Sequence, residues 1–485
     1  MVAADSGALR VTLAALAALA SLVLLGDVLW SIALGTPELF WAVLPLGPMR
    51  LASVLALSLA CGLCALVCAR GLPRTERARA ALLLGCVAAL FLGNGRYVGS
   101  NDAGATRLIP FVLLREGRLC FEGSAQLELP GGTLPYWFVP AGEHIISRYP
   151  VATGILAAPA YLPALLGRYD PRRERVHELE RIAAALLALT TVALVLAFAR
   201  RVLPPAAAGF VAVCYALGTG VASILSKALW QHVGGAAGFG LALAGLLLIE
   251  RRRAFWAIGL GCGIAVAARS TNVVPALWLL LAAAFAHGPR SAALAAAVSC
   301  GPALAQLAYA RYYFGSFLGH GYGSEAQAGW SAVWSEGVLG ILLSPGRGLL
   351  LYSPLLAFAA FALYRGDPAL DRRVSRCLLL ASVSLLLVMG KWWCWWGGRS
   401  AGERMTSDVL PLWGVGLALA YKQLQARPGL RRAFHLCALY GVLLQTLITF
   451  GRPGPLAKQL FVDVSEGAWS WRAFAPLSYL LDLTR

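Results

Sequence analysis

Residues 51–69 read LASVLALSLACGLCALVCA, a run without a single charged side chain. A helix of about 20 such residues spans the hydrocarbon core of a bilayer. Residues 11–34 and 433–450 are similarly apolar. Over the whole chain 59% of residues are hydrophobic and 13% are charged, whereas soluble domains carry about 25% charged residues. The alternating segments of about ten residues typical of a membrane β-barrel are absent. The sequence therefore predicts an all-α, polytopic integral membrane protein.

The basic residues indicate how the chain is threaded through the membrane. The net charge is +18, and Lys and Arg cluster in short loops between apolar runs. Such loops usually face the cytoplasm, and no segment resembles a nucleic-acid-binding module, so we expect a bilayer and no nucleic acid as partner. This threading predicts about 11–13 transmembrane helices. It divides the chain into an N-terminal hairpin (1–70), a main region (71–450) with a long first outer loop (95–180), and a short outer tail (451–485).

Residues 149–166 (YPVATGILAAPAYLPALL) allow two interpretations. They are apolar enough to cross the bilayer, and Arg172, Arg173 and Arg175 would then be cytoplasmic. The segment also contains Pro150, Pro159 and Pro163, and proline interrupts the helical hydrogen-bond ladder. Broken backbone is costly in lipid, so we expect an interfacial or re-entrant segment.

Most of the 11 cysteines lie within apolar runs and are expected to pack as small core residues. Cys120 and Cys394 fall in predicted loops, and a disulfide between them is left open by the sequence.

The first outer loop opens with GRYVGSNDAGATRLIPFVLLREG, in which Asp102 follows the end of a predicted span. An ionised Asp102 could deprotonate an acceptor hydroxyl or hold a cation, or it could cap a helix over 103–115. Further along the loop, Glu143 and His144 are secondary candidates for binding a substrate or a metal. Solvated loop residues are the simpler interpretation of this pair.

The second outer turn reads SKALWQH, residues 226–232. It places Lys227, Gln231 and His232 beside a tryptophan in one short connection. Lys227 could simply extend its ammonium to the membrane interface, but this concentration of polar groups favours a binding site.

Two later outer loops contain arginines flanked by glycine. SPGRGLLLYSP carries Arg347 and Tyr352, and KWWCWWGGRSAGER carries Lys391, Arg399 and Arg404. Arginine presents a planar fork of donors that suits phosphate. Anchoring in the membrane interface is the alternative, since tryptophan and arginine are common there.

Together these stretches resemble the GT-C superfamily of polyprenyl-phosphate-dependent glycosyltransferases, in particular bacterial proteins similar to the protein mannosyltransferase branch, family 39. The resemblance covers about residues 79–420. It rests on SNDAGATRLIPFVLLREG with RYPVATGILAAPAY, on SKALWQH, on YYFGSFLGHGYG with SPGRGLLLYSP, and on WWGGRSAGERMTSDVLP.

The resemblance implies an inverting transfer of a sugar from a polyprenyl-phosphate donor to a lipid, glycan or protein acceptor, outside the cytoplasmic membrane of the cell. It implies that Asp102 is the catalytic base. The phosphate would be bound by Lys227, Gln231, His232, Arg347, Lys391, Arg399 and Arg404. Many members carry a second acid in the second outer loop, but SKALWQH has none. We therefore assign no metal ligands, and a divalent metal is left open as a cofactor.

The alternative function is a transporter or flippase for a lipid-linked sugar or another solute. Transporters often contain internal repeats and interrupted helices near the bilayer midplane. No repeat is evident here, and the polar residues gather in the loops, which favours the enzyme.

Overall fold

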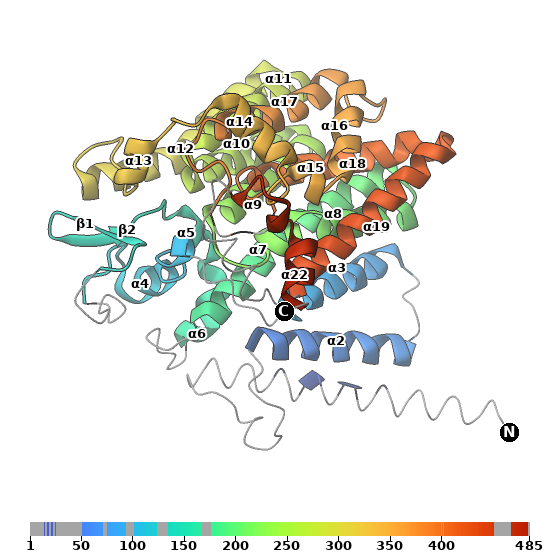
Figure 1. Ribbon diagram of the computed structural model, residues 1–485, viewed down its shortest axis with the longest axis horizontal. Helices are drawn as coiled ribbons and strands as arrows, with labels where there is room; N and C mark the ends of the chain where they lie inside the picture. Colours follow the sequence, from blue (N-terminus) through green and yellow to red (C-terminus); the bar gives the residue numbers. More distant parts are fainter. Residues whose placement is uncertain are drawn as a thin grey trace.

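The computed structural model describes residues 51–70, 75–93, 101–123, 134–166, 176–398, 400, 402–450 and 467–483, with a few isolated positions between 14 and 25. Within these ranges the protein is a helical bundle with one two-stranded hairpin (Figure 1). This confirms the predicted all-α membrane fold. Of the predicted outer tail (451–485) the structure describes residues 467–483, and Arg399 lies outside the described residues.

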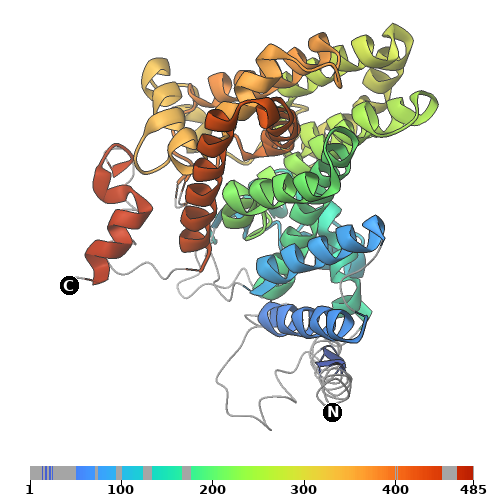
Figure 2. The same ribbon diagram turned by 90° about the vertical axis from the view of Figure 1, so that its right-hand side faces the viewer.

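The bundle begins with two helices that pack on each other, α2 (Leu51–Arg70) and α3 (Glu76–Gly93). Figure 2 shows them as a layer on one side of the bundle. The first loop region follows, and its elements are η1 (Asn101–Ala103), α4 (Ile109–Glu116), β1 (Phe138–Ala141), β2 (His144–Ser147), α5 (Ala152–Ala157), η3 (Ala158–Tyr161) and α6 (Leu162–Leu166). The strands pair antiparallel, with Phe138 opposite Ser147.

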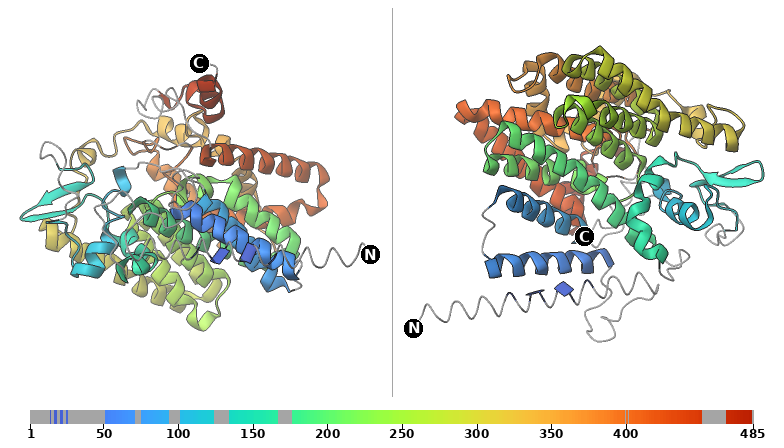
Figure 3. Two further views of the ribbon diagram at one scale, coloured as in Figure 1. Left: turned by 90° about the horizontal axis from the view of Figure 1, so that it is seen from below. Right: turned by 180° about the vertical axis from the view of Figure 1, so that it is seen from behind.

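The centre of the chain forms the elements α7 (Val176–Val202), α8 (Pro205–Gly218), the π-helical turn η4 (Val221–Leu225), α9 (Gln231–Leu247), α10 (Arg251–Ala268), η5 (Ser270–Asn272), α11 (Val273–His287) and α12 (Pro289–Phe314). The last part forms α13 (Ser324–Ala328), α14 (Trp334–Leu343), α15 (Leu349–Tyr352), α16 (Leu355–Arg365), α17 (Arg372–Met389), η6 (Ser407–Val409), α18 (Leu410–Gln423), η7 (Leu424–Ala426), α19 (Pro428–Phe450), η8 (Trp471–Ala473) and α22 (Ala475–Leu483). Figure 3 shows the β1–β2 hairpin projecting from the bundle near the end of α12.

Four helical stretches among the described residues are long and apolar enough to cross a membrane, namely Val176–Val202, Ser270–His287, Pro289–Phe314 and Pro428–Phe450. Others, such as α8 and α9, are apolar but shorter. Helix length alone therefore does not reproduce the predicted number of spans, because several elements of the bundle are short or interrupted.

The segment 149–166 folds as three short pieces, α5, η3 and α6. Pro159 lies in the first turn of η3 and Pro163 at the start of α6. The segment is thus interrupted where the prolines predict, and no single straight helix runs through it.

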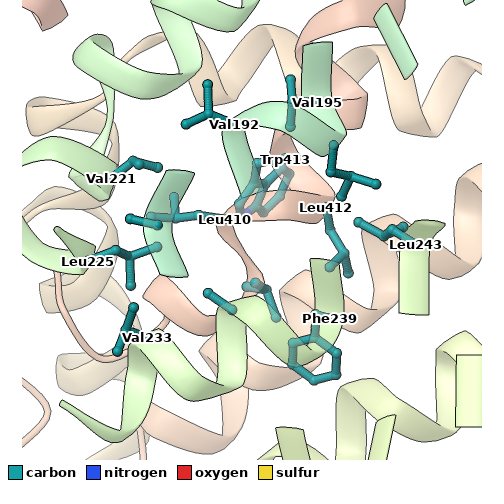
Figure 4. Packing of buried hydrophobic residues seen from close by; sticks show 14 of the residues in the cluster. Val192, Val195, Val221, Leu225, Val233, Phe239, Leu243, Leu410, Leu412 and Trp413 are labelled. Carbon is teal, nitrogen blue, oxygen red and sulfur yellow. The ribbon is translucent and has the colours of Figure 1, made fainter. Parts of the chain in front are cut away.

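The core lies where α7, α8, α9 and α18 meet. Every residue of α18 from Leu410 to Ala420 is buried. Figure 4 shows Leu410, Leu412 and Trp413 among valines and leucines of the neighbouring helices. A helix that is apolar on all sides, as α18 is, belongs in such a central position.

Small residues bring α9 and α10 into backbone contact. A Cβ added to Gly238 of α9 would lie 2.7 Å from the carbonyl oxygen of Gly261 in α10. On the other side of α10, a Cβ at Gly263 would lie 2.6 Å from the Ser299 oxygen of α12. Close approach through small residues is a common way for membrane helices to associate, and it fixes the helices that carry part of the site.

Candidate active site

Asp102 and Arg404 form an ion pair between two distant loops. Arg404 Nη1 lies 2.8 Å from Asp102 Oδ2, and the side chains are 10% and 30% exposed, respectively. Asp102 does not cap a helix, because α4 begins only at Ile109 and its N-cap is Leu108 without a side-chain cap bond. The capping interpretation of Asp102 is therefore wrong. Asp102 is therefore partly exposed, whereas Arg404 is largely buried.

The guanidinium of Arg404 also lies over the ring of Trp230, 5.1 Å from its centroid. Its Nε has no hydrogen-bond partner among the described residues. Arg404 therefore retains one unpaired donor, which is buried. Trp230 belongs to the turn 226–232, so this contact joins the second predicted loop to the fourth.

Two tyrosines connect Asp102 to a second acid. The Tyr149 hydroxyl donates to Asp102 Oδ1 at 3.3 Å, and it lies 3.0 Å from the Tyr136 hydroxyl. The Tyr136 hydroxyl in turn donates to Glu325 of α13. Burial, followed by the negative charge of Asp102, raises the pKa of Tyr149. Burial, again followed by Asp102, raises the pKa of Glu325 to about 7.

The row of side chains from Asp102 to Glu325 contains three hydrogen-bonding contacts. The two tyrosines between the acids supply only two hydroxyl protons for these contacts. When both acids are ionised, each tyrosine donates to its own acid, and no proton remains for the contact between the two hydroxyls. One additional proton, on either acid, completes the chain. The geometry therefore allows a proton on Asp102 to be passed to Glu325.

Behind Arg404, a fully buried cluster surrounds Asp408. Its carboxylate accepts from Arg269 Nη1 at 2.9 Å and Asn272 Nδ2 at 2.9 Å, and His232 Nδ1 lies 2.8 Å away. A buried carboxylate needs such compensation. Arg269 Nη1 also donates to the Met405 carbonyl oxygen at 2.7 Å, so the cluster holds the backbone next to Arg404.

The same segment contains a second buried acid, Glu403. It accepts from the Thr406 amide at 2.8 Å and the Thr406 hydroxyl at 2.6 Å. Burial raises the pKa of Glu403 to about 7, although these hydrogen bonds oppose the shift. Glu403 faces a small pocket between α15, α18 and α19, whose lining includes Tyr352 and Gln445.

The first loop is held in place by a buried ion pair with α7. Arg107 Nη1 lies 3.4 Å from Glu180 Oε2, and Glu180 Oε1 accepts from the Leu229 amide at 3.1 Å. Glu180 therefore fixes the loop that carries Asp102 and the turn that carries Trp230 relative to each other.

Three of the predicted phosphate-binding residues contact the backbone of neighbouring segments. The Lys227 ammonium donates to the Thr449 carbonyl oxygen at 2.8 Å, and Lys391 Nζ donates to the Ala332 oxygen at 3.0 Å. Buried Arg347 donates to the Trp396 oxygen at 3.0 Å and the Gly398 oxygen at 2.9 Å. These contacts hold backbone segments together.

Of the other predicted binding residues, Gln231 and His232 contact residues near Asp102 and Arg404, whereas Tyr352 lies elsewhere. The Gln231 amide lies 3.3 Å from the Tyr322 hydroxyl, and the Tyr322 ring packs edge-on against Tyr149, with centroids 5.4 Å apart. His232 supports Asp408, as described above. Tyr352 accepts from the Ala475 amide at 3.2 Å.

Glu143 is exposed in the turn of the hairpin, and the neighbouring His144 contacts Glu122 at 2.9 Å. Neither of these secondary candidates reaches the site. Both Cys120 and Cys394 are free thiols, so the disulfide that the sequence left open is not formed.

A divalent metal at Asp102 finds a poor donor set. The carboxylate is already paired with Arg404 and Tyr149, and no second carboxylate contacts it among the residues that the structure describes. Hard cations prefer several oxygen ligands. We derive no step through a metal at this site.

No known family and no curated protein matches the chain. Two solved structures are similar to it. ArnT from Cupriavidus metallidurans, bound to undecaprenyl phosphate, has a TM-score of 0.48 at 12% identity, over 84% of this chain and 74% of that chain. The archaeal oligosaccharyltransferase AglB from Archaeoglobus fulgidus, in complex with an inhibitory peptide and a dolichol-phosphate, has a TM-score of 0.47 at 14% identity, over 81% of this chain and 59% of that one. At these identities the likeness is one of fold, and the function proposed below rests on this chain's own side chains.

Proposed function

We propose that the protein is a glycosyltransferase that moves a sugar from a polyprenyl-phosphate donor to an acceptor hydroxyl on the extracytoplasmic side of the cytoplasmic membrane. The observation that carries this proposal is the ion pair of Asp102 and Arg404. It supplies a base and a phosphate ligand next to each other on a membrane-embedded bundle. The basic loops predicted to be cytoplasmic lie elsewhere in the chain and support the orientation.

In the proposed reaction Asp102 removes the proton from the acceptor hydroxyl as its oxygen attacks the anomeric carbon. The bond between that carbon and the phosphate oxygen breaks, and the polyprenyl phosphate leaves with the electron pair. Attack from the face opposite the phosphate inverts the anomeric centre. Arg404 stabilises the charge on the departing phosphate, a role for which preorganised donors are effective.

Donor binding frees the base for this step. Before the donor binds, Arg404 neutralises Asp102. A phosphate competes with Asp102 for the same guanidinium, and the buried Nε of Arg404, which has no hydrogen-bond partner among the described residues, becomes a donor to it once the side chain turns. As Arg404 turns toward the phosphate, Asp102 loses its partner and becomes a better proton acceptor. Its proton then passes through Tyr149 and Tyr136 to Glu325.

The test is sugar transfer by the purified full-length protein in proteoliposomes, with polyprenyl-phosphate sugars extracted from the native membrane as donors. We expect Asp102→Asn to reduce transfer by at least about 100-fold, the usual contribution of a general base. Asp371→Asn is the matched control, because Asp371 is an exposed N-cap far from the site and asparagine caps equally well. Undiminished transfer by Asp102→Asn would overturn the proposal. Lipid-linked sugar crossing the bilayer without transfer would establish the transporter instead.

A further inference from the structure

Three side chains of metal-ligating type meet in the first loop region, away from Asp102. They are Cys120 and Glu122, which follow α4, and His144, the first residue of β2. The Cys120 sulfur, a Glu122 oxygen and a His144 ring nitrogen all lie within 4.8 Å of one another. Cys120 is buried, whereas the side chains of Glu122 and His144 are 30% and 39% exposed. Thiolate, carboxylate and imidazole together form a donor set typical of zinc.

We propose that Cys120, Glu122 and His144 bind a Zn²⁺ ion, with a water molecule in the fourth position. Zinc bonds of about 2.0–2.3 Å place tetrahedral ligand atoms roughly 3–4 Å apart. The three donor atoms are already close to that spacing. His144 Nδ1 and Glu122 Oε1 are 2.9 Å apart, so they need to separate by less than about 1 Å to admit the ion.

The backbone and a neighbouring arginine orient the carboxylate. Glu122 Oε1 accepts from the Ile145 amide at 2.8 Å and faces His144. Glu122 Oε2 is held by Arg118 Nη1 at 2.9 Å. Such outer contacts commonly hold metal ligands in position. The partly exposed His144 and Glu122 leave a route by which the ion enters.

The charges around the cluster balance when zinc is bound. Arg118 Nη1 lies 3.9 Å from the Cys120 sulfur, and this positive charge opposes a cation. Arg118 is, however, also paired with Glu116. On binding, the thiol releases its proton to solvent, and His144 Nδ1 donates its lone pair in the neutral form. The ion's two positive charges and that of Arg118 are then offset by Cys120, Glu122 and Glu116.

A bound ion would join the segment after α4 to the hairpin that leads to the site. Arg148 and Tyr149 follow β2 within the same stretch of chain, and Tyr149 contacts Asp102. His144 also stacks near Tyr312 at the end of α12, with centroids 6.3 Å apart. Zinc would thus stabilise the loop region at the junction of three segments.

Zinc binding by the purified full-length chain tests this inference independently of sugar transfer. The protein is prepared without a histidine tag, stripped with EDTA and titrated with Zn²⁺ alone, and its zinc content is measured by plasma mass spectrometry. We expect one ion per chain, and an affinity about tenfold or more lower in Cys120→Ser and in His144→Gln. Cys300→Ser and His435→Gln, which change the same residue types elsewhere, keep the wild-type affinity.

Cobalt gives a second readout that does not depend on a variant. Co²⁺ bound by the wild-type protein should show a charge-transfer absorption from the Cys120 thiolate. Failure to bind stoichiometric zinc, the absence of this absorption at one equivalent of Co²⁺, or unchanged zinc affinity in His144→Gln would each overturn the inference. If Cys120→Ser does not fold, His144→Gln and the cobalt spectrum still decide.

Discussion

Asp408→Asn is expected to destabilise the protein strongly and to displace Arg404 from the site. The substitution removes the only negative charge in contact with buried Arg269, at 2.9 Å, among the described residues. An asparagine can still accept from Arg269, but its NH₂ group then faces the donor amide of Asn272, which now lies 2.9 Å from Asp408. Removing one partner of a buried ion pair typically costs about 3–5 kcal/mol. The free energy of unfolding should fall by that amount.

The assay is thermal unfolding in detergent, followed by tryptophan fluorescence. Asp408→Asn should lower Tm by several degrees, whereas the exposed control Asp371→Asn should leave Tm unchanged. The double variant Arg269→Met/Asp408→Asn should lose less stability than the sum of its single variants, because no unpaired buried charge remains. A Tm for Asp408→Asn equal to that of the control, or strict additivity in the double variant, would show that Asp408 does not compensate the buried charge of Arg269.

Three further results are expected. Sugar transfer should rise with pH through about 7, because Glu325, whose pKa burial raises to that value, accepts the proton only when ionised. Glu325→Gln should abolish this limb of the pH–rate profile, and a profile matching the wild type would exclude the relay. Gly238→Ala should lower Tm, since its Cβ would lie 2.7 Å from backbone atoms of α10, whereas Gly301→Ala, with no atom within 4 Å, should raise Tm slightly through helix propensity. Burial would raise the pKa of Glu122, but hydrogen bonds hold it at about 2. Its stabilising contribution should be complete above about pH 4.5 and be lost as the pH falls toward 2, so Glu122→Gln should flatten the dependence of Tm on pH in this range.

The sequence predicted the membrane bundle correctly, because an apolar run as long as 51–69 matches the thickness of the bilayer's hydrocarbon core. It also selected Asp102 and Arg404 as candidates, because the family resemblance implies a base at Asp102 and an arginine in an outer loop suits phosphate. It did not predict that these two residues pair. The pairing depends on how loops far apart in the chain fold against each other, and local patterns do not encode that arrangement.

The same limit applies to the backbone contacts of the predicted phosphate ligands. Lys227 and Arg347 have the chemistry of phosphate ligands, and the sequence does not show that each donates to a backbone carbonyl oxygen. Glu325 and Arg269 join the site's network although nothing in their local sequence marks them. Only the three-dimensional contacts show which charged groups are already satisfied and which, like Arg404, retain a donor.

Binding of undecaprenyl phosphate, measured together with sugar transfer for the same variants, separates the proposed role of Asp102 as base from that of Arg404 as phosphate ligand. Arg404→Gln should weaken lipid binding and reduce transfer. Asp102→Asn should abolish transfer but bind the lipid as tightly as the wild type or more tightly, because the substitution releases Arg404 from its ion pair. Loss of lipid binding in Asp102→Asn to the same extent as in Arg404→Gln would contradict these separate roles, as would full transfer by either variant.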